Sequence, residues 1–141
     1  MVELERFVAA QDAAGWEGIL AELRRGRKVG HWMWFVFPQL RGLGFSAMAE
    51  RFGVAGIDEA CAYLAHPVLG PRLCEAVALL TAHKDRTAVE ILGTVDAMKL
   101  RSSLTLFGAA SEEAGVFGEA LAQFYGGVAD PQTRRILAAT A

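Results

Sequence analysis

The sequence predicts an all-α fold, a compact single-domain bundle of about seven to nine short and medium helices over residues 1–141. Three observations support this class. Apolar residues recur at helical spacing along most of the chain. Glycines separate the recurrences, as expected for helix ends. Hydrophobic residues make up 53% of a chain of single-domain length, so enough apolar surface exists to offset the entropy lost on folding.

Four apolar stripes predict helices in the first half of the chain, and Gly15, Gly26 and Gly53 end or separate them. Asp58 is expected to cap the fourth of these helices, because a carboxylate oxygen can accept hydrogen bonds from the free N–H groups of a first turn. The stripes are Leu4-Phe7-Val8, Trp16-Ile19-Leu20-Leu23, Phe45-Met48-Ala49-Phe52 and Ala60-Cys61-Leu64.

The second half predicts five more helices. His66-Pro67 starts the first of them, since proline suits the first helical position, and Asp96 is expected to cap the third. The five helices run through Leu73, Val77 and Leu80 to about His83, over Thr87–Leu92, from Met98 to about Phe107, through Phe117, Leu121 and Phe124 to Gly126-Gly127, and onward from Asp130-Pro131. A small two-stranded sheet formed by 32–37 and 104–107 is the alternative, because both runs have strand length and composition.

Composition excludes several classes of protein. The net charge of −2 argues against a bulk nucleic-acid binder. No apolar run is long enough for a transmembrane helix, and the acidic start of the chain is unlike a signal peptide, so a cytoplasmic location is expected.

Cys61 and Cys74 are expected to be reduced, buried thiols, with a disulfide or redox pair as the alternative. Neither a metal-ligand spacing nor a cofactor motif is present, so no metal and no cofactor are predicted, and the oligomeric state is left open.

One segment stands out, Arg24–Ser46, here called the basic aromatic segment: RRGRKVGHWMWFVFPQLRGLGFS. No Asp or Glu occurs between Glu22 and Glu50, whereas five bases and five aromatic residues fall within the segment. Aromatic faces beside fixed positive charge can hold a flat ring and an anionic group together. The bases are Arg24, Arg25, Arg27, Lys28 and Arg41, and the aromatic residues are Trp32, Trp34, Phe35, Phe37 and Phe45.

Structural interpretations of the same segment stay open. The run 32–37 is equally typical of a buried helix, and 24–28 is typical of a solvated helix end that favours cations. We therefore divide the segment into two sets. The expected core residues are Trp32, Met33, Phe35 and Val36, and the expected site residues are Lys28, His31, Trp34 and Gln39. His31 is the candidate general acid or base, because its unperturbed pKa lies near neutrality.

A second acid-free stretch lies between Asp96 and Glu112. On a helix, Lys99, Ser102 and Ser103 share one face, and we expect this face, with Thr105, to complete an anion pocket against the basic aromatic segment. In the alternative interpretation, the hydroxyls bond back to carbonyls one turn earlier. Gln11, at the end of an apolar stripe, is a further candidate hydrogen-bonding group.

Four motifs, FVAAQ, GRKVGHWMWFVFPQLRGLG, YLAHPVLGPRL and KLRSSLTLF, resemble the bacterial family called domain of unknown function 1810. The resemblance runs from about Leu4 to Leu137. It implies a single all-helical domain, and it implies no particular activity. The recurring polar positions that it implies are Gln11, Lys28, His31, Gln39, His66, Arg72, Lys99, Ser103 and Thr105.

Two functional hypotheses follow, and whether the protein is an enzyme is left open. In the first, a basic and aromatic pocket binds or processes an anionic, ring-bearing, nucleotide-like small molecule. Lys28 and Lys99 hold the anion, Trp34 stacks, and His31 moves protons, while Gln11, Gln39, Ser103 and Thr105 supply hydrogen bonds. In the alternative, the aromatic residues are core and the basic rim docks an acidic protein without catalysis. Nucleic-acid binding is a weaker third hypothesis, given the charge.

Overall fold

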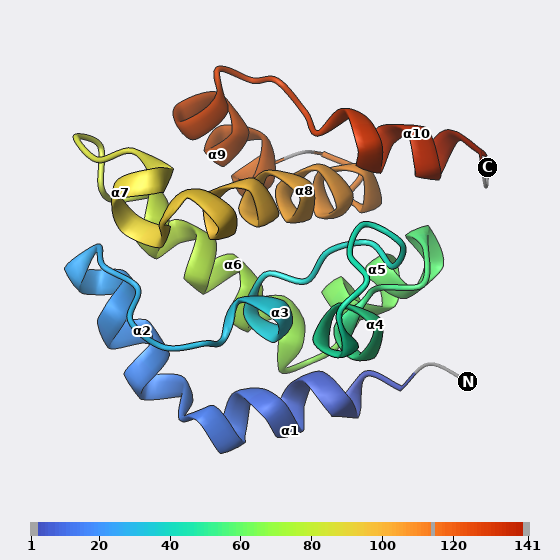
Figure 1. Ribbon diagram of the computed structural model, residues 1–141, viewed down its shortest axis with the longest axis horizontal. Coiled ribbons are helices and arrows are strands. Elements are labelled where there is room, and N and C mark those ends of the chain that lie inside the picture. The colour runs from blue at the N-terminus through green and yellow to red at the C-terminus, as the bar shows by residue number, and fades with distance from the viewer. Residues whose placement is uncertain (1–2, 114, 140–141) are drawn as a thin grey trace.

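The computed structural model describes residues 3–113 and 115–139, which fold into ten helices (Figure 1). The helices are α1 (Glu5–Ala14), α2 (Trp16–Arg25), α3 (Met33–Val36), α4 (Ala47–Phe52), α5 (Ile57–Ala65), α6 (Leu69–Thr81), α7 (Ala88–Leu92), α8 (Thr94–Ala110), α9 (Gly115–Tyr125) and α10 (Pro131–Ala139). In the described ranges no strand is present, and one isolated parallel bridge joins Leu40 to Val54. The predicted all-α class is therefore confirmed.

Two details of the prediction are corrected. The described residues form ten helices rather than seven to nine, and one of them is the one-turn α3 inside the basic aromatic segment. The two-stranded alternative is wrong: 33–36 is helical, and 104–107 lies inside the 17-residue α8. A continuous helix satisfies its own backbone hydrogen bonds, whereas a lone strand would leave them unpaired.

Several helix ends lie where the sequence predicts them. Gly15 and Gly26 end α1 and α2 with positive φ angles of 89° and 72°, a backbone region that favours glycine. Thr87 opens α7 with a reciprocal capping box to Glu90. Asp130 accepts hydrogen bonds from the backbone N–H and the hydroxyl of Thr133 at the start of α10, which confirms this cap.

Other predicted ends are wrong by a few residues. Asp58 and Asp96 lie in the first turns of α5 and α8 and do not cap them, because these helices begin immediately after Gly56 and Gly93. Pro67 lies ahead of α6 rather than at its first position, whereas the start signal at His66 is confirmed, because His66 supplies the cap. The ring Nδ1 of His66 accepts hydrogen bonds from the backbone N–H groups of residues 68 and 69, at 3.1 and 3.2 Å.

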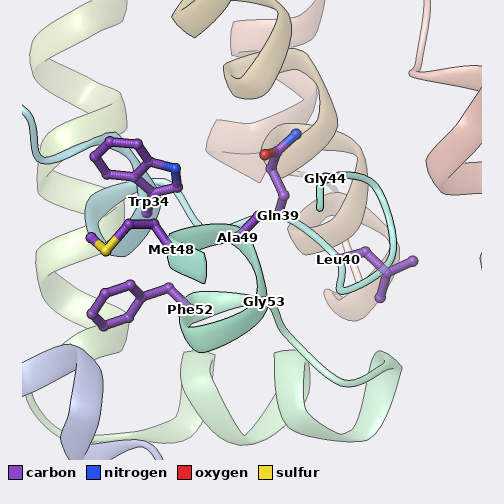
Figure 2. Close-up of a pocket in the computed structure, with 8 residues that line it drawn as sticks. All are labelled: Trp34, Gln39, Leu40, Gly44, Met48, Ala49, Phe52 and Gly53. Atoms are coloured by element: carbon purple, nitrogen blue, oxygen red, sulfur yellow. The ribbon is translucent and has the colours of Figure 1, made fainter. Parts of the chain in front are cut away.

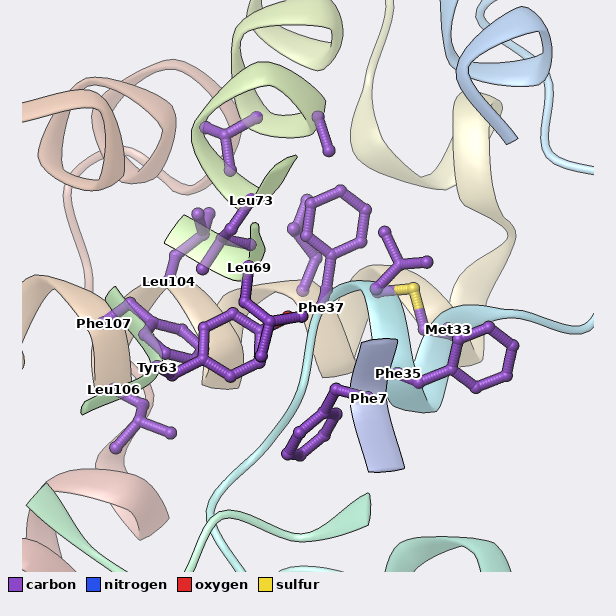
Figure 3. Close-up of a cluster of buried hydrophobic side chains, with 14 of the residues drawn as sticks. Phe7, Met33, Phe35, Phe37, Tyr63, Leu69, Leu73, Leu104, Leu106 and Phe107 are labelled. Carbon is purple, nitrogen blue, oxygen red and sulfur yellow. The ribbon is translucent and has the colours of Figure 1, made fainter. Parts of the chain in front are cut away.

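The core is a single cluster that contains residues from both halves of the chain (Figure 3). Trp32, Met33, Phe35 and Val36 are all buried, as predicted from the division of the basic aromatic segment. Phe45 is a correction: it precedes α4, which Ser46 caps, and its side chain is 90% exposed rather than part of the apolar stripe. Cys61 is also exposed rather than buried, and both described cysteines are free thiols.

One tyrosine lies in the interior and the other packs, half-buried, against it. Tyr63 is fully buried in α5, where its hydroxyl accepts a hydrogen bond from Gln11. Tyr125, at the end of α9, donates its hydroxyl proton to the carbonyl of Ala97 in α8. Burial raises the pKa of both phenols above the ordinary value, so each is held in its neutral form.

The arrangement brings the basic aromatic segment beside α8. In Figure 1, α8 runs across the middle of the molecule, with α9 and α10 on one side, and the segment passes from α2 through α3 to α4 on the other. Helix α8 also packs against α5, α7, α9 and α10. Within the described ranges, no helix is long and apolar enough to cross a membrane.

Candidate functional site

A carboxylate joins the two acid-free stretches. Asp96, in the first turn of α8, forms an ion pair with Lys28 (Oδ2 to Nζ, 2.8 Å), and its other oxygen lies 3.8 Å from the ammonium of Lys99. The Lys28 side chain is only 8% exposed, whereas that of Lys99 is 24% exposed. Because Asp96 lies closer to the buried lysine and neutralises it, the uncompensated positive charge of the three residues resides on Lys99.

Both lysines also lie over tryptophan rings. The Lys99 ammonium is 4.7 Å from the ring centroid of Trp34, and that of Lys28 is 5.1 Å from the ring of Trp32. These distances are those of cation–π contacts. The two rings differ in burial, since Trp32 is buried and Trp34 is half-buried. Trp34 is therefore the aromatic residue of this pair with surface left to contact a ligand.

A second carboxylate holds the loop that carries Lys28. Glu22, near the end of α2, accepts hydrogen bonds from the backbone N–H groups of Val29 and Gly30 and from the Trp32 indole N–H at 3.1 Å. Burial raises the pKa of Glu22, but these hydrogen bonds and the charge of Lys28 outweigh it, and the net pKa lies below its ordinary value. Glu22 thus fixes the start of the segment as an anion.

The space directly between Trp34 and Gln39 is small (Figure 2). With Met48 and Phe52 as further walls it holds about 10 Å³, which is roughly room for one water molecule. Figure 2 shows the Gln39 side chain leaving this space toward α8. Gln39 and Gly44 also line a larger neighbouring cavity, so the two spaces share a wall.

The larger space, here called the Lys99 cavity, has a volume of about 320 Å³. Its walls come from three parts of the chain: residues 39–44, the first turns of α8, and the start of α10. The lining residues are Gln39, Leu43, Gly44, Val95, Met98, Lys99, Arg101, Ser102, Asp130 and Gln132. Apolar, hydrogen-bonding and cationic groups therefore face one volume, within the usual size range of small-molecule sites.

The structure brings only part of the predicted site to this cavity. Lys99 and Gln39 line it, Trp34 lies under the Lys99 ammonium, and Lys28 is linked to it through Asp96. His31 is exposed on the loop before α3 and lines none of the cavities described here.

Gln11, Ser103 and Thr105 lie elsewhere. Gln11 is 1% exposed; it donates to the carbonyl of Phe35 at 2.8 Å and accepts from Arg72 at 3.1 Å. Ser103 is 1% exposed inside α8. The hydroxyl of Thr105 donates to the carbonyl of Arg101 one turn earlier and accepts from the backbone N–H of residue 130, as the alternative interpretation of the hydroxyls expected.

Asp96, which pairs with the lysines beside the cavity, and three residues that line it were not predicted as site residues from the sequence. Asp96 bounds the second acid-free stretch, and nothing in the sequence pairs it with a lysine 68 positions earlier. Asp130 and Gln132 come from a distant helix start, and only the fold brings them to α8. Arg101 could have been identified from the sequence as a second cation of the site, because it follows Lys99 by two residues. Its guanidinium donates to the carbonyls of residues 128 and 129, which anchors the loop before α10.

Comparison with known proteins places the chain in a family. The model of the family described as "Protein of unknown function (DUF1810)" matches residues 1–137, and the chain belongs to this family, as the four motifs predict. The chain is also similar to a conserved hypothetical protein of Mycobacterium tuberculosis, Rv1873, whose crystal structure is known. The two are 50% identical, the match covers 97% of each chain, and the TM-score is 0.95. No curated protein matches.

Proposed function

We propose that this domain binds a small anionic, ring-bearing molecule of nucleotide-like chemistry in the Lys99 cavity. One observation carries the proposal: a single volume of about 320 Å³ is lined both by Lys99 and by the exposed apolar residues Val95 and Met98. Val95 is 66% and Met98 68% exposed, so both offer surface for a flat ring beside a cation. A ligand with a ring and an anionic group would use both features.

The charges favour an anion at Lys99. Lys28 pairs with Asp96 at 2.8 Å, closer than the 3.8 Å between Asp96 and Lys99, so the three groups together keep one net positive charge beside the cavity. Arg101 adds a second positive charge to the wall, while Asp130 directs one carboxylate oxygen to its own helix cap. The amides of Gln39 and Gln132 and the hydroxyl of Ser102 complete the wall as hydrogen-bonding groups.

The proposal is limited to binding. A general acid or base must reach its substrate within hydrogen-bond distance, and His31 is not among the residues that line the cavity. Replacing His31 by alanine should therefore leave ligand binding unchanged.

A thermal-shift screen tests the proposal. Nucleoside monophosphates, sugar phosphates and uncharged nucleosides are added to the wild-type protein and to Lys99→Ala, with Lys84→Ala as the matched control on the exposed connection after α6. We expect an anionic, ring-bearing compound to raise the melting temperature of the wild type, Lys84→Ala and His31→Ala, and to have no effect on Lys99→Ala. If no anion raises the wild-type melting temperature, or if Lys99→Ala responds equally, the proposal is wrong.

A protein-docking role is the second candidate, and it rests on a different surface. Arg24, Arg25 and Arg27 are all exposed at the end of α2, and none forms an ion pair with any residue in 3–113 or 115–139. Such a rim would attract an acidic partner. Binding of a poly-glutamate peptide that is lost when the three arginines become glutamate, but retained in Lys99→Ala, would favour this role.

A further inference from the structure

A second cavity lies where the approach to α1, the end of α4 and the start of α5 meet. Its volume is about 510 Å³, and it shares no lining residue with the Lys99 cavity. We call it the arginine cavity, because three of its six lining residues are arginines: Glu3, Arg6, Arg41, Arg51, Ala55 and Glu59. Apart from Ala55, every lining residue carries a charged side chain.

Arg6 and Glu59 form the rigid part of this cavity. They pair at 3.2 Å, with side chains only 15% and 10% exposed. Arg6 also donates to the carbonyls of Arg51 and Gly53, at 2.8 and 3.0 Å, and Glu59 accepts from the backbone N–H of Ala55. The carboxylate of Glu59 is therefore committed to protein groups, and Arg6 fixes the backbone that carries Arg51.

The charges that remain are the guanidinium groups of Arg41 and Arg51 and the exposed carboxylate of Glu3, so the cavity keeps one net positive charge. Arg41 donates one hydrogen bond, to the carbonyl of Gly53 at 3.2 Å, and the Arg51 guanidinium lies 5.1 Å from the ring centroid of Phe52. Neither guanidinium forms an ion pair with the described part of the chain. Since a guanidinium has five N–H donors, both residues have donors left for an anion.

The backbone beneath Arg41 is held firmly. Its N–H donates to the carbonyl of Val54 at 2.7 Å, and the N–H of Val54 donates to the carbonyl of Gln39 at 2.8 Å. A Cβ added at Gly53 would lie 2.9 Å from the Arg41 Cα and 2.7 Å from the Ala49 carbonyl oxygen. Only glycine permits this close approach, which sets the position of Arg41 relative to α4.

We propose that the arginine cavity binds the phosphate group of a phosphorylated small molecule, held between Arg41 and Arg51. The planar fork of arginine matches phosphate geometry and donates two hydrogen bonds at once. The rigid mounting of Arg41 lowers the ordering cost of binding. The polar, charged walls favour a hydrophilic ligand, in contrast to the apolar surface in the Lys99 cavity. This site goes beyond the proposed function and does not depend on it.

Calorimetric titration of the full chain with inorganic phosphate tests the site, with acetate as a singly charged probe. The test variant is Arg41→Gln/Arg51→Gln, and the matched control is Arg24→Gln/Arg25→Gln, which removes the same charge from exposed positions on α2. We expect phosphate to bind the wild type and the control alike, and the test variant at least about tenfold more weakly, because each lost charged hydrogen bond weakens binding by about that factor. Acetate should bind more weakly than phosphate.

Three results would overturn the proposal: no phosphate binding by the wild type, equal binding by the test variant, or an equal loss in both double variants, which would indicate an unspecific charge effect. Circular dichroism establishes that each variant is folded. The variant Arg41→Lys/Arg51→Lys keeps both positive charges but removes the planar guanidinium groups, so it measures what guanidinium geometry contributes to binding. Lys99→Ala should bind phosphate as the wild type does. The two cavities can therefore fail or succeed separately.

Discussion

At the scale of single residues, Glu22 organises the loop that leads into the basic aromatic segment. One carboxylate oxygen accepts two backbone N–H groups and an indole N–H, and the resulting pKa lies below the ordinary value. A carboxyl whose pKa is lowered by folding stabilises the native state above its unfolded pKa. That stabilisation is lost as the pH falls through the folded pKa.

We predict that Glu22→Gln lowers the free energy of unfolding by about 1–2 kcal/mol at neutral pH, because charged hydrogen bonds to three donors become weaker ones. As the pH falls below the usual carboxyl range of about 4, the wild-type residue is protonated and the difference should shrink. Urea unfolding of both proteins at neutral and acidic pH measures this. A difference that stays constant with pH would contradict the role of the charge.

Asp96 links the first turn of α8 to the loop after α2, which carries Lys28. Removing one partner of a buried ion pair leaves an uncompensated charge, which costs more than the pair itself contributes. Lys28→Met and Asp96→Asn should each lower the free energy of unfolding by about 3 kcal/mol. The double variant should lose at least about 1 kcal/mol less than the sum of the two. Additive losses in a double-mutant cycle would show that the contact is not coupled, and Lys84→Met gives the baseline for an exposed lysine.

The sequence predicted the parts of the candidate site for which the type of side chain alone indicates burial or exposure. The division of 32–39 into core and accessible residues agrees with the burial of Trp32 and Met33 and the partial exposure of Trp34 and Gln39. Asp96 was missed, because its partner depends on where α8 crosses the segment. Gln11 was expected to reach a ligand, but its amide bonds to three protein partners in α3, α5 and α6, which the sequence does not connect to it.

At the scale of elements, residues close in sequence determine where most helices begin and end. They do not determine which helices contact each other. Gly15, Gly26 and the start of a helix at Thr87 are local signals, and they were predicted; the reciprocal capping box between Thr87 and Glu90 was not. The one-turn α3 has no such signal, because its sequence is apolar throughout and its ends are set by packing. Gly70 is a second example. Nothing in the sequence marks this residue, yet its backbone in α6 lies in close contact with the backbone of α5.

We predict opposite effects for two glycine-to-alanine changes. A Cβ at Gly70 would lie 2.1 Å from the carbonyl oxygen of Leu64, so Gly70→Ala must push two helices apart and should cost at least about 3 kcal/mol. Gly18 in α2 has open space around it, and Gly18→Ala should stabilise by about 0.5 kcal/mol through helix propensity. Urea midpoints measured together test this; a Gly70→Ala protein as stable as the wild type would contradict the close approach.

At the scale of the whole molecule, the interior is one cluster that extends from Leu4, ahead of α1, to Ala120 in α9. The cluster crosses the chain several times, and each half contributes fully buried aromatic residues, such as Phe7 and Phe107. No part of the described chain has a separate core. We therefore propose that residues 1–141 unfold as a single cooperative unit.

The distribution of tryptophan makes this proposal testable. All three tryptophans lie in the first 34 residues, so their fluorescence reports on the N-terminal quarter, while circular dichroism reports on helices throughout. We predict that the two signals give the same midpoint and slope in urea. Fluorescence that changes at a distinctly lower or higher urea concentration would show that α1–α3 unfold separately from α8 and α9.

The two phenols, one buried and one half-buried, give the protein an optical reporter in alkaline solution. Tyr63 and Tyr125 are the only tyrosines of the chain, and burial raises the pKa of each above the ordinary value of about 10. The stability gained by keeping them neutral is present below that value and is lost as the pH rises through the folded-state pKa. Tyrosinate absorbance in the near ultraviolet should therefore stay low past the ordinary range and rise together with the loss of helical dichroism. An early tyrosinate signal from intact protein would contradict this.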